Sequence, residues 1–201
     1  YRNDKRYLSV GNMLDKENKA IYGLEFSYET IPNELNLFDY DAFKAYKGDF
    51  YCVVTNLLTC EAEYMKYTGE DRTNTVLKAT CALPMLFPPI IINDTPYMDG
   101  GLTDSIPFMR AFEDGCDRVL VVLTREAGYT KTTSTSTKAI ARYYEKEYPK
   151  LSEVMLSRAE RYNECLKQLK EYEDSGKVMV IRPAVSKGFS RLEKDKNKIL
   201  S

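Results

Sequence analysis

One carboxylate in this sequence has neighbours that would allow it to take part in a reaction. Asp99 follows a short apolar run, and Gly100 and Gly101 come directly after it. Glycine has no Cβ, so the backbone can turn sharply here and another group can approach the carboxylate closely. We therefore expect Asp99 to end a strand, with its side chain within reach of a reacting group.

Residue type alone leaves three roles open for Asp99: a catalytic base, a metal ligand or a turn former, and Asp-Gly is a common turn pair. The 201 residues contain no histidine, and no acidic cluster accompanies Asp99. A metal site needs several such ligands, so we expect no metal and no cofactor. If the chain belongs to a hydrolase, its general base is then unlike the usual imidazole.

The residues around Asp99 form a wider pattern. Residues 79–89 read A-T-C-A-L-P-M-L-F-P-P, residues 97–102 read Y-M-D-G-G-L, and residues 115–122 read G-C-D-R-V-L-V-V. In this order they resemble the patatin-like phospholipases. In that family A-S-x-A-x-P-x-x-F-P-P precedes a D-G-G or D-G-A box, and a G-A-D-x-V-x-V-V strand follows. The resemblance is strongest over residues 49–124.

The resemblance implies a serine acyl hydrolase that uses a Ser–Asp dyad, in which the aspartate of the D-G-G box takes the serine proton directly. Asp99 is the matching position, and Gly100 and Gly101 form the supporting turn. The implied substrate is a phospholipid or another acyl ester, hydrolysed through an acyl-serine intermediate. The implied fold is a patatin-like α/β hydrolase domain with three layers, α/β/α.

The sequence contains no serine in the family's nucleophile motif, G-x-S-x-G. The nearest string, residues 7–11, reads Y-L-S-V-G, with tyrosine in place of the first glycine, so Ser9 is interpreted as an ordinary polar residue. The family's glycine-rich oxyanion loop is also missing. We therefore expect residues 1–201 to be the C-terminal portion of a single patatin-like domain, incomplete at the N-terminus. The serine would lie upstream, and the chain alone would be inactive.

A second interpretation keeps the fold but not the catalysis. On this alternative the chain is a non-catalytic module that binds lipids or interacts with proteins. The upstream sequence would distinguish the two, since only the enzyme requires G-x-S-x-G and a glycine-rich loop.

Composition limits the partners and the compartment. A formal net charge of −1 gives no basic surface for nucleic acid. The five cysteines are odd in number and never form C-x-x-C, which favours reduced, mostly buried thiols, including Cys81 at a helix end. No stretch approaches the roughly 20 apolar residues that span a bilayer. We expect a cytoplasmic protein that contacts membranes peripherally.

Local patterns predict the elements that position Asp99. Strands are expected at residues 49–56 and 61–67 as one hairpin, 90–92 and 96–99 as another, and 118–124 and 177–182 as buried strands. Helices are expected after Asp39, after Thr73 at 74–82, from Ser105 and Pro107 to Gly115, over about 138–175 with a division at Pro149, and from 189 to 201. Residues 130–137 are expected to form a polar loop.

Three apolar or amphipathic stretches carry further expectations. Residues 119–123 are nearly all apolar, which is typical of a strand covered on both faces. Without the first strand of the domain such faces would be exposed, so we expect a homo-oligomer or a longer polypeptide. Residues 85–90 either line an acyl-chain pocket or lipid interface, or pack beneath the D-G-G turn. The charged helices at 138–174 are expected to be solvated, with a lid or partner surface as the alternative.

Overall fold

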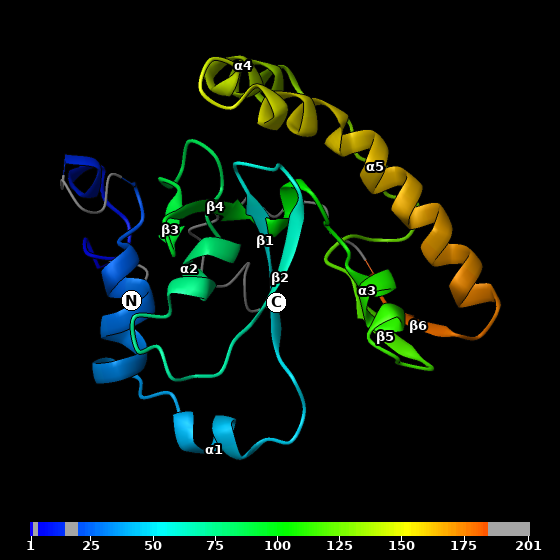
Figure 1. The fold of residues 1–201 in the computed structure, drawn as a ribbon, viewed down its shortest axis with the longest axis horizontal. Helices are drawn as coiled ribbons and strands as arrows, with labels where there is room; N and C mark the ends of the chain where they lie inside the picture. Colours follow the sequence, from blue (N-terminus) through cyan, green and yellow to red (C-terminus); the bar gives the residue numbers. More distant parts are fainter. Residues whose placement is uncertain (2–3, 15–19, 185–201) are drawn as a thin grey trace. The chain divides into compact units, whose positions relative to one another are not determined.

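The computed structural model describes residues 1, 4–14 and 20–184. Backbone contacts divide the chain into two compact units, the first comprising Tyr1–Ser105 and Thr133–Arg158 and the second Ile106–Thr132 and Ala159–Ser201. Helices are combined with one antiparallel and one parallel sheet, and the predicted α/β class is confirmed (Figure 1). The prediction of a single domain over residues 1–201 stays a prediction.

The first unit contains a four-stranded antiparallel sheet in the order β2-β1-β4-β3 (Figure 1). Its strands are β1 (Tyr51–Asn56), β2 (Ala62–Lys66), β3 (Ile90–Ile92) and β4 (Thr95–Asp99). Both hairpins expected from the sequence are present, β1 with β2 and β3 with β4. The pairing between β1 and β4 places Val54 opposite Asp99, so β1 is the strand against which the turn at Asp99 is built.

The β3–β4 hairpin turns at Asn93 and Asp94, whose φ angles are 48° and 61°. Two successive left-handed residues are typical of a type I′ turn, whose twist matches that of antiparallel strands. Asn and Asp enter this region more readily than other residues that carry a Cβ. Local residue type thus returns the chain into β4, which ends at Asp99.

In the described part of the chain, five helices lie before, between or directly after these strands along the sequence. They are the 3-10 helices η1 (Val10–Leu14) and η3 (Gly100–Leu102), the π-helix η2 (Phe26–Leu35), and the α-helices α1 (Tyr40–Ala45) and α2 (Thr75–Thr80). As predicted, Asp39 caps α1, accepting from the Ala42 N–H at 2.8 Å. The predicted Thr73 cap of α2 is wrong. The carboxylate of Asp71 accepts from the N–H groups of Thr73 and Thr75 at 2.9 and 2.7 Å instead.

Two helices follow residue 133, α4 (Thr135–Tyr144) and α5 (Pro149–Asp174). They occupy the stretch predicted to be helical, and the second begins at Pro149 as expected. The loop predicted for residues 130–137 is shorter than expected, because Ser134 Oγ accepts from the Thr137 N–H at 3.1 Å and caps α4. Serine is among the preferred N-cap residues, and here that local bond ends the loop.

An apolar core in the first unit joins the neighbours of Asp99 to α5. Met98 and Leu102 lie on either side of the turn in sequence, and they belong to one buried cluster with Leu151 and Met155 of α5. The other buried members of the cluster are Leu57, Cys60, Ala141 and Tyr144. Full burial of a large apolar side chain stabilises a fold by roughly 1.5–3 kcal/mol, so this cluster fixes the start of α5 against the turn.

The second unit contains a two-stranded parallel sheet of β5 (Val119–Val122) and β6 (Val178–Ile181), together with α3 (Phe108–Glu113). Val119 pairs with Val178 and Val122 with Ile181. The buried members of its core are Ile106, Phe108, Val121, Leu169 and Val178. One face of the sheet therefore packs on residues from α3 and α5.

The other face of this sheet is exposed, so the prediction of cover on both faces is wrong for the described residues. Leu120, Val122 and Met179 are 58%, 67% and 68% exposed. Successive side chains of a strand point to opposite faces, and α3 and α5 supply apolar partners for one face only. The expectation of a homo-oligomer assumed such an exposed apolar strand face. The association itself stays a prediction.

Of the two remaining helix predictions, one can be compared with the structure. The residue before α3 is Pro107, and Ser105 makes no capping bond to this helix; its hydroxyl donates to the carbonyl of Gly101. The helix predicted over residues 189–201 lies outside the described residues. Among the helices that are described, none is long and apolar enough to cross a bilayer.

Candidate active site

Asp99 is the last residue of β4, and both its backbone N–H and its backbone carbonyl make hydrogen bonds. Its N–H donates to the carbonyl of Ala82 at 3.0 Å, and its own carbonyl accepts from Thr55 Oγ1 at 2.8 Å. Thr55 is fully buried and its hydroxyl also shares a hydrogen bond with that of Thr103. The position of the Asp99 backbone is therefore determined by β1 and by the loop before β3.

The carboxylate of Asp99 is half-buried and has a defined orientation. Its Oδ1 accepts from the N–H of Gly101 at 2.6 Å, which caps the short helix η3. A hydrogen bond to an ionised acceptor is among the stronger ones in proteins. The structure thus places Asp99 in a turn at a strand end, as expected from the Asp-Gly-Gly residues; its catalytic role stays a prediction.

Both glycines lie where space is limited rather than where φ is positive, since neither is among the described residues with positive φ. A Cβ on Gly100 would lie 2.2 Å from the carbonyl oxygen of Val53 in β1. A Cβ on Gly101 would lie 2.9 Å from Asp99 Oδ1 and 3.2 Å from Arg158 Nη2. Gly100 therefore lets the turn pack against a strand backbone, and Gly101 leaves room for two charged groups.

The carbonyl of Gly101 accepts two hydrogen bonds. Arg158 Nε of α5 donates at 2.5 Å, and Ser105 Oγ donates at 2.7 Å. No role was expected for Arg158 from the sequence. The one available signal is its spacing, seven residues after Leu151 and three after Met155, which puts an arginine on an apolar helix face.

Tyr28 of the π-helix is a further residue that the sequence did not single out. Burial raises the pKa of its phenol above the ordinary value, and interactions with the Cys81 thiol and the negative charge of Asp99 act in the same direction. Tyr28 therefore stays a neutral hydroxyl at neutral pH. Its hydroxyl is close enough to Asp99 for the charge of the carboxylate to act on it.

A family model described as patatin-like phospholipase matches residues 7–112, which is more than half of the chain and includes Asp99. The chain belongs to the patatin-like phospholipase family. The resemblance to this family is thereby confirmed; the match includes the blocks at residues 79–89 and 97–102, whereas residues 115–122 lie outside it. The family is one of lipid acyl hydrolases.

A second family model, a domain of unknown function named DUF6363, matches residues 148–201 of this patatin-like chain. The match includes the whole of α5, and so it includes Arg158. No curated protein matches the chain.

Ser9, the residue nearest to a patatin-like nucleophile motif in the sequence, has a local structural contact. Its hydroxyl oxygen accepts from the Gly11 N–H at 3.1 Å, and its own N–H donates to the carbonyl of Ile21 at 3.0 Å. These bonds close the turn in which η1 begins. They agree with the interpretation of Ser9 as an ordinary polar residue.

Tyr28 also lines an apolar cavity of about 360 Å³ in the first unit. The other lining residues are mostly aromatic: Ser27, Pro32, Phe38, Tyr40, Phe43, Phe50, Tyr67, Asn74 and Leu77. Phe43 and Tyr67 contact edge to face, with ring centroids 5.3 Å apart. Apolar cavities of this size accept a small ligand or part of a hydrocarbon chain.

The segment at residues 85–90 is only partly exposed. Met85 is 52% exposed. Residues 86–90 are half-buried, and Ile90 packs against a buried cluster formed by Val54, Ala79 and Tyr97. The buried side chains beside the turn are Met98 and Leu102 instead. Of the two interpretations of this segment, core packing is therefore wrong for Met85, and a lipid-facing role stays a prediction.

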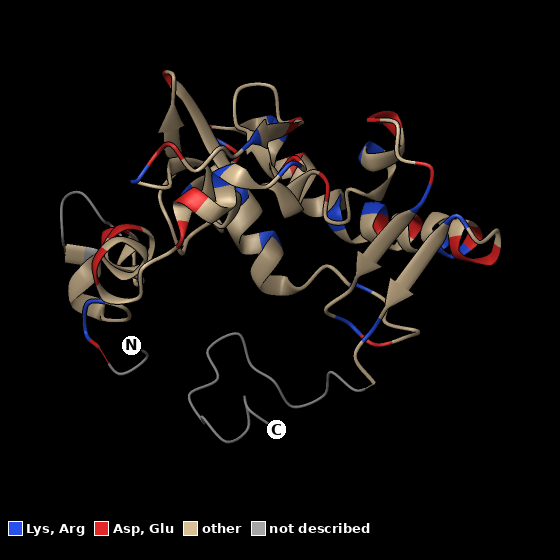
Figure 2. Cartoon of the chain, turned by 90° about the horizontal axis from the view of Figure 1, so that it is seen from below, with Lys and Arg blue, Asp and Glu red and all other residues tan. Residues whose placement is uncertain are grey.

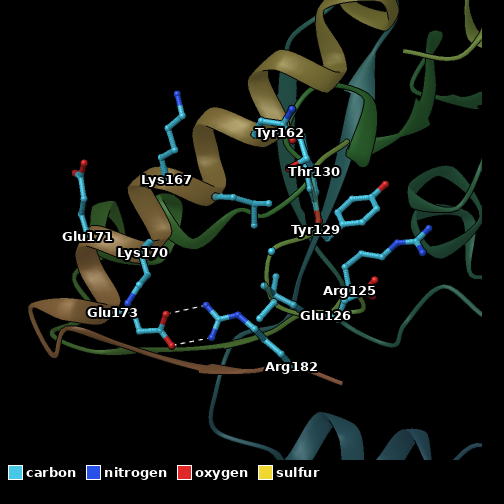
Figure 3. Close-up of a pocket in the computed structure, with 15 residues that line it drawn as sticks. Arg125, Glu126, Tyr129, Thr130, Tyr162, Lys167, Lys170, Glu171, Glu173 and Arg182 are labelled. Atoms are coloured by element: carbon cyan, nitrogen blue, oxygen red, sulfur yellow. Dashed lines mark hydrogen bonds and ion pairs between the residues drawn. The ribbon is translucent and has the colours of Figure 1, made fainter. Parts of the chain in front are cut away.

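The second unit has a larger cavity of about 880 Å³ at the carboxyl ends of β5 and β6 (Figure 3). Arg182 and Glu173 form a two-point ion pair there, with distances of 2.8 and 2.7 Å. Lys167 and Lys170 also have acidic partners within the helix. Most cations of this cavity are thus neutralised, and Figure 2 shows both signs of charge on the same helices and loops.

The thiols and the acidic residues complete the inventory of reactive groups. The part of the chain that the structure describes holds no group of three or more Cys, Asp or Glu able to bind a metal. Cys52 and Cys60 are buried as predicted, whereas Cys81 and Cys116 are exposed. Cys81 lies at a helix end as predicted, since it is the C-cap of α2, but the prediction that it is buried is wrong.

Proposed function

We propose that Asp99 is the general base of a lipid acyl hydrolase that works through a Ser–Asp dyad, with the serine supplied by a segment upstream of these residues. The observation that carries the proposal is the hydrogen bond from the Gly101 N–H to Asp99 Oδ1, at 2.6 Å. It gives one oxygen a fixed partner and leaves the carboxylate oriented at the end of a strand. Membership of the patatin-like family supports the same role.

In this mechanism Asp99 Oδ2 accepts the proton of the serine hydroxyl as the oxygen attacks the ester carbonyl. The tetrahedral intermediate collapses to an acyl-serine, the alcohol leaves with a proton, and water then hydrolyses the acyl-enzyme with Asp99 again as the base. An aspartate with its usual pKa near 4 is a weak base, so the dyad needs a shaped site that excludes water.

The decisive experiment uses a polypeptide that carries both a G-x-S-x-G segment and this chain. Turnover of a p-nitrophenyl acyl ester is measured for the wild type and for Asp99→Asn, which keeps the shape of the side chain and removes its basicity. We expect kcat to fall by about 10⁴-fold with KM and thermal unfolding nearly unchanged. Near-normal turnover of Asp99→Asn would reduce Asp99 to a turn former.

The substrate is proposed to be a phospholipid or another acyl ester that is taken from a lipid surface. The exposed side chains of Met85 and Ile91 support peripheral contact with such a surface. The exposed free thiols of Cys81 and Cys116 fit a reducing compartment such as the cytoplasm. Co-sedimentation with phosphatidylcholine vesicles, compared between wild type and Met85→Ser/Ile91→Ser, tests the contact.

The alternative is a module that binds lipid or protein without catalysis, and the absence of G-x-S-x-G from these residues supports it. On the catalytic proposal the isolated chain has no ester hydrolase activity, because a base without nucleophile or oxyanion donors gives little rate enhancement. If the pure chain hydrolyses an ester and Asp99→Ala abolishes that turnover, the chain contains a nucleophile of its own and the proposal that the serine lies upstream is wrong. A serine-containing polypeptide that binds vesicles but hydrolyses no ester would favour the module.

A further inference from the structure

We infer that Arg158 of α5 is a positioning residue for Asp99, so that the segment matched by DUF6363 contributes to the patatin-like active site. The inference rests on the role proposed above for Asp99. It assigns a function to residues 148–158, which lie in the segment matched by the family model DUF6363. These residues belong to the same compact unit as Asp99.

The first supporting observation is the place of the guanidinium group. Its Nε donates to the carbonyl of Gly101 at 2.5 Å. Its Nη2 lies 3.2 Å from the point that a Cβ on Gly101 would occupy, and Asp99 Oδ1 lies 2.9 Å from the same point. The cation and the carboxylate therefore both lie close to the position that a side chain of residue 101 would occupy.

Arg158 acts on Asp99 through the backbone of Gly101. The N–H of Gly101 holds Asp99 Oδ1, and its carbonyl is held by Arg158 and by the hydroxyl of Ser105. A shift of Gly101 would move the donor that orients the carboxylate. Because a charged donor makes the stronger bond, Arg158 contributes more to holding Gly101 than the Ser105 hydroxyl does.

The second observation is the face of α5 from which the arginine extends. Leu151, Met155 and Arg158 follow at helical spacing, so they lie along one side of the helix. The first two belong to the same buried cluster as Met98 and Leu102, which lie on either side of the turn in sequence. One helix face thus supplies the apolar contacts that seat α5 and the cation that bonds to Gly101.

The test uses the serine-containing polypeptide and compares Arg158→Ala and Arg158→Lys with Arg142→Ala. Arg142 is an exposed arginine of α4 and serves as the matched control. We expect Arg158→Ala to lower kcat by about 100-fold, the size of effect that a displacement of about 1 Å produces, with KM changed less than about threefold. Arg158→Lys should fall in between, because lysine lacks the planar fork.

Two readouts separate positioning from a loss of stability. Millimolar guanidinium should restore activity to Arg158→Ala and have no effect on Arg142→Ala. In the Asp99→Asn background, Arg158→Ala should cause no further loss, because residues that act as one unit are not additive. If Arg158→Ala does not fold, Arg158→Lys and Arg158→Gln answer the same question.

The outcomes distinguish this inference from the proposed function. If Asp99→Asn is inactive while the Arg158 variants match wild type, the inference is wrong and the dyad stands. Additive losses with no rescue by guanidinium would also overturn it, since they indicate a structural role. If Asp99→Asn keeps its activity, the general base is misassigned and both ideas fall together.

Discussion

Substituting Gly100 with alanine should destabilise the chain through one defined clash. The new Cβ would lie 2.2 Å from the oxygen and 2.4 Å from the carbon of the Val53 carbonyl, against about 3.4 Å for ordinary contact. That carbonyl cannot move freely, because it accepts a hydrogen bond from Thr80 Oγ1 at 2.6 Å and its residue pairs with Tyr64 of β2. The strand or the turn must therefore shift by about 1 Å.

The size of the effect follows from three contributions. Overpacking costs about 1–3 kcal/mol, loss of the Thr80 bond costs about 1 kcal/mol, and a less flexible unfolded chain returns about 0.4–1 kcal/mol. We expect Gly100→Ala to lower the free energy of unfolding by about 1–3.6 kcal/mol. For a chain of this length that lowers Tm by about 2–14 °C.

Urea unfolding followed by far-UV circular dichroism measures this change, since the chain has no tryptophan to report by fluorescence. Gly128→Ala is the control, because its Cβ would meet no atom within 4 Å although its φ is +77°. Strain alone should cost it about 1 kcal/mol. A loss below about 0.5 kcal/mol for Gly100→Ala would refute the reasoning, because no backbone clash could then exist.

The neighbouring substitution should separate stability from activity, and two further tests concern other parts of the chain. In Gly101→Ala the Cβ meets the movable side chain of Asp99, so unfolding should change by less than about 1 kcal/mol while ester turnover by the serine-containing polypeptide falls about 100-fold. Although burial opposes it, hydrogen bonds from two threonines hold the pKa of Asp71 at about 2, against 3.8 for an ordinary aspartate. The stability that Asp71 contributes is thus present above pH 3.8 and is lost as the pH falls through about 2. Urea unfolding across this pH range should show the loss for wild type and not for Asp71→Asn. The exposed Cys81 should react with a thiol reagent at pH 8 in the folded chain, whereas Cys52, whose pKa burial raises to about 11, should react only on unfolding, as peptide mass mapping would show.

The features of the fold that depend on neighbouring residues were predictable from sequence. Asp39 caps α1, the Asn93-Asp94 pair turns the β3–β4 hairpin, and β1 is rich in β-branched residues, so each follows from a preference that acts within a few positions. The strand-end position of Asp99 belongs to the same group. Where two capping residues stand close together, as Asp71 and Thr73 do before α2, the sequence alone does not decide between them.

The features that depend on distant contacts were not predictable. A near-continuous apolar run such as β5 indicates cover on both faces, but cover depends on which other elements reach it, and Leu120 and Val122 are exposed. The contact of Arg158 with Gly101 has no local signature. An arginine among Leu151 and Met155 indicates only that the helix face meets something able to accept its hydrogen bonds.

The bond between Arg158 and Gly101 joins positions that are 57 residues apart, and this separation affects how the chain comes into existence. A ribosome releases Asp99 and both glycines well before α5 has been synthesised. Closing so long a loop is entropically costlier than forming a hairpin, so the turn meets its arginine only after the local elements of the first unit have formed. The carboxylate therefore reaches its final setting only after the first turns of α5 have been synthesised.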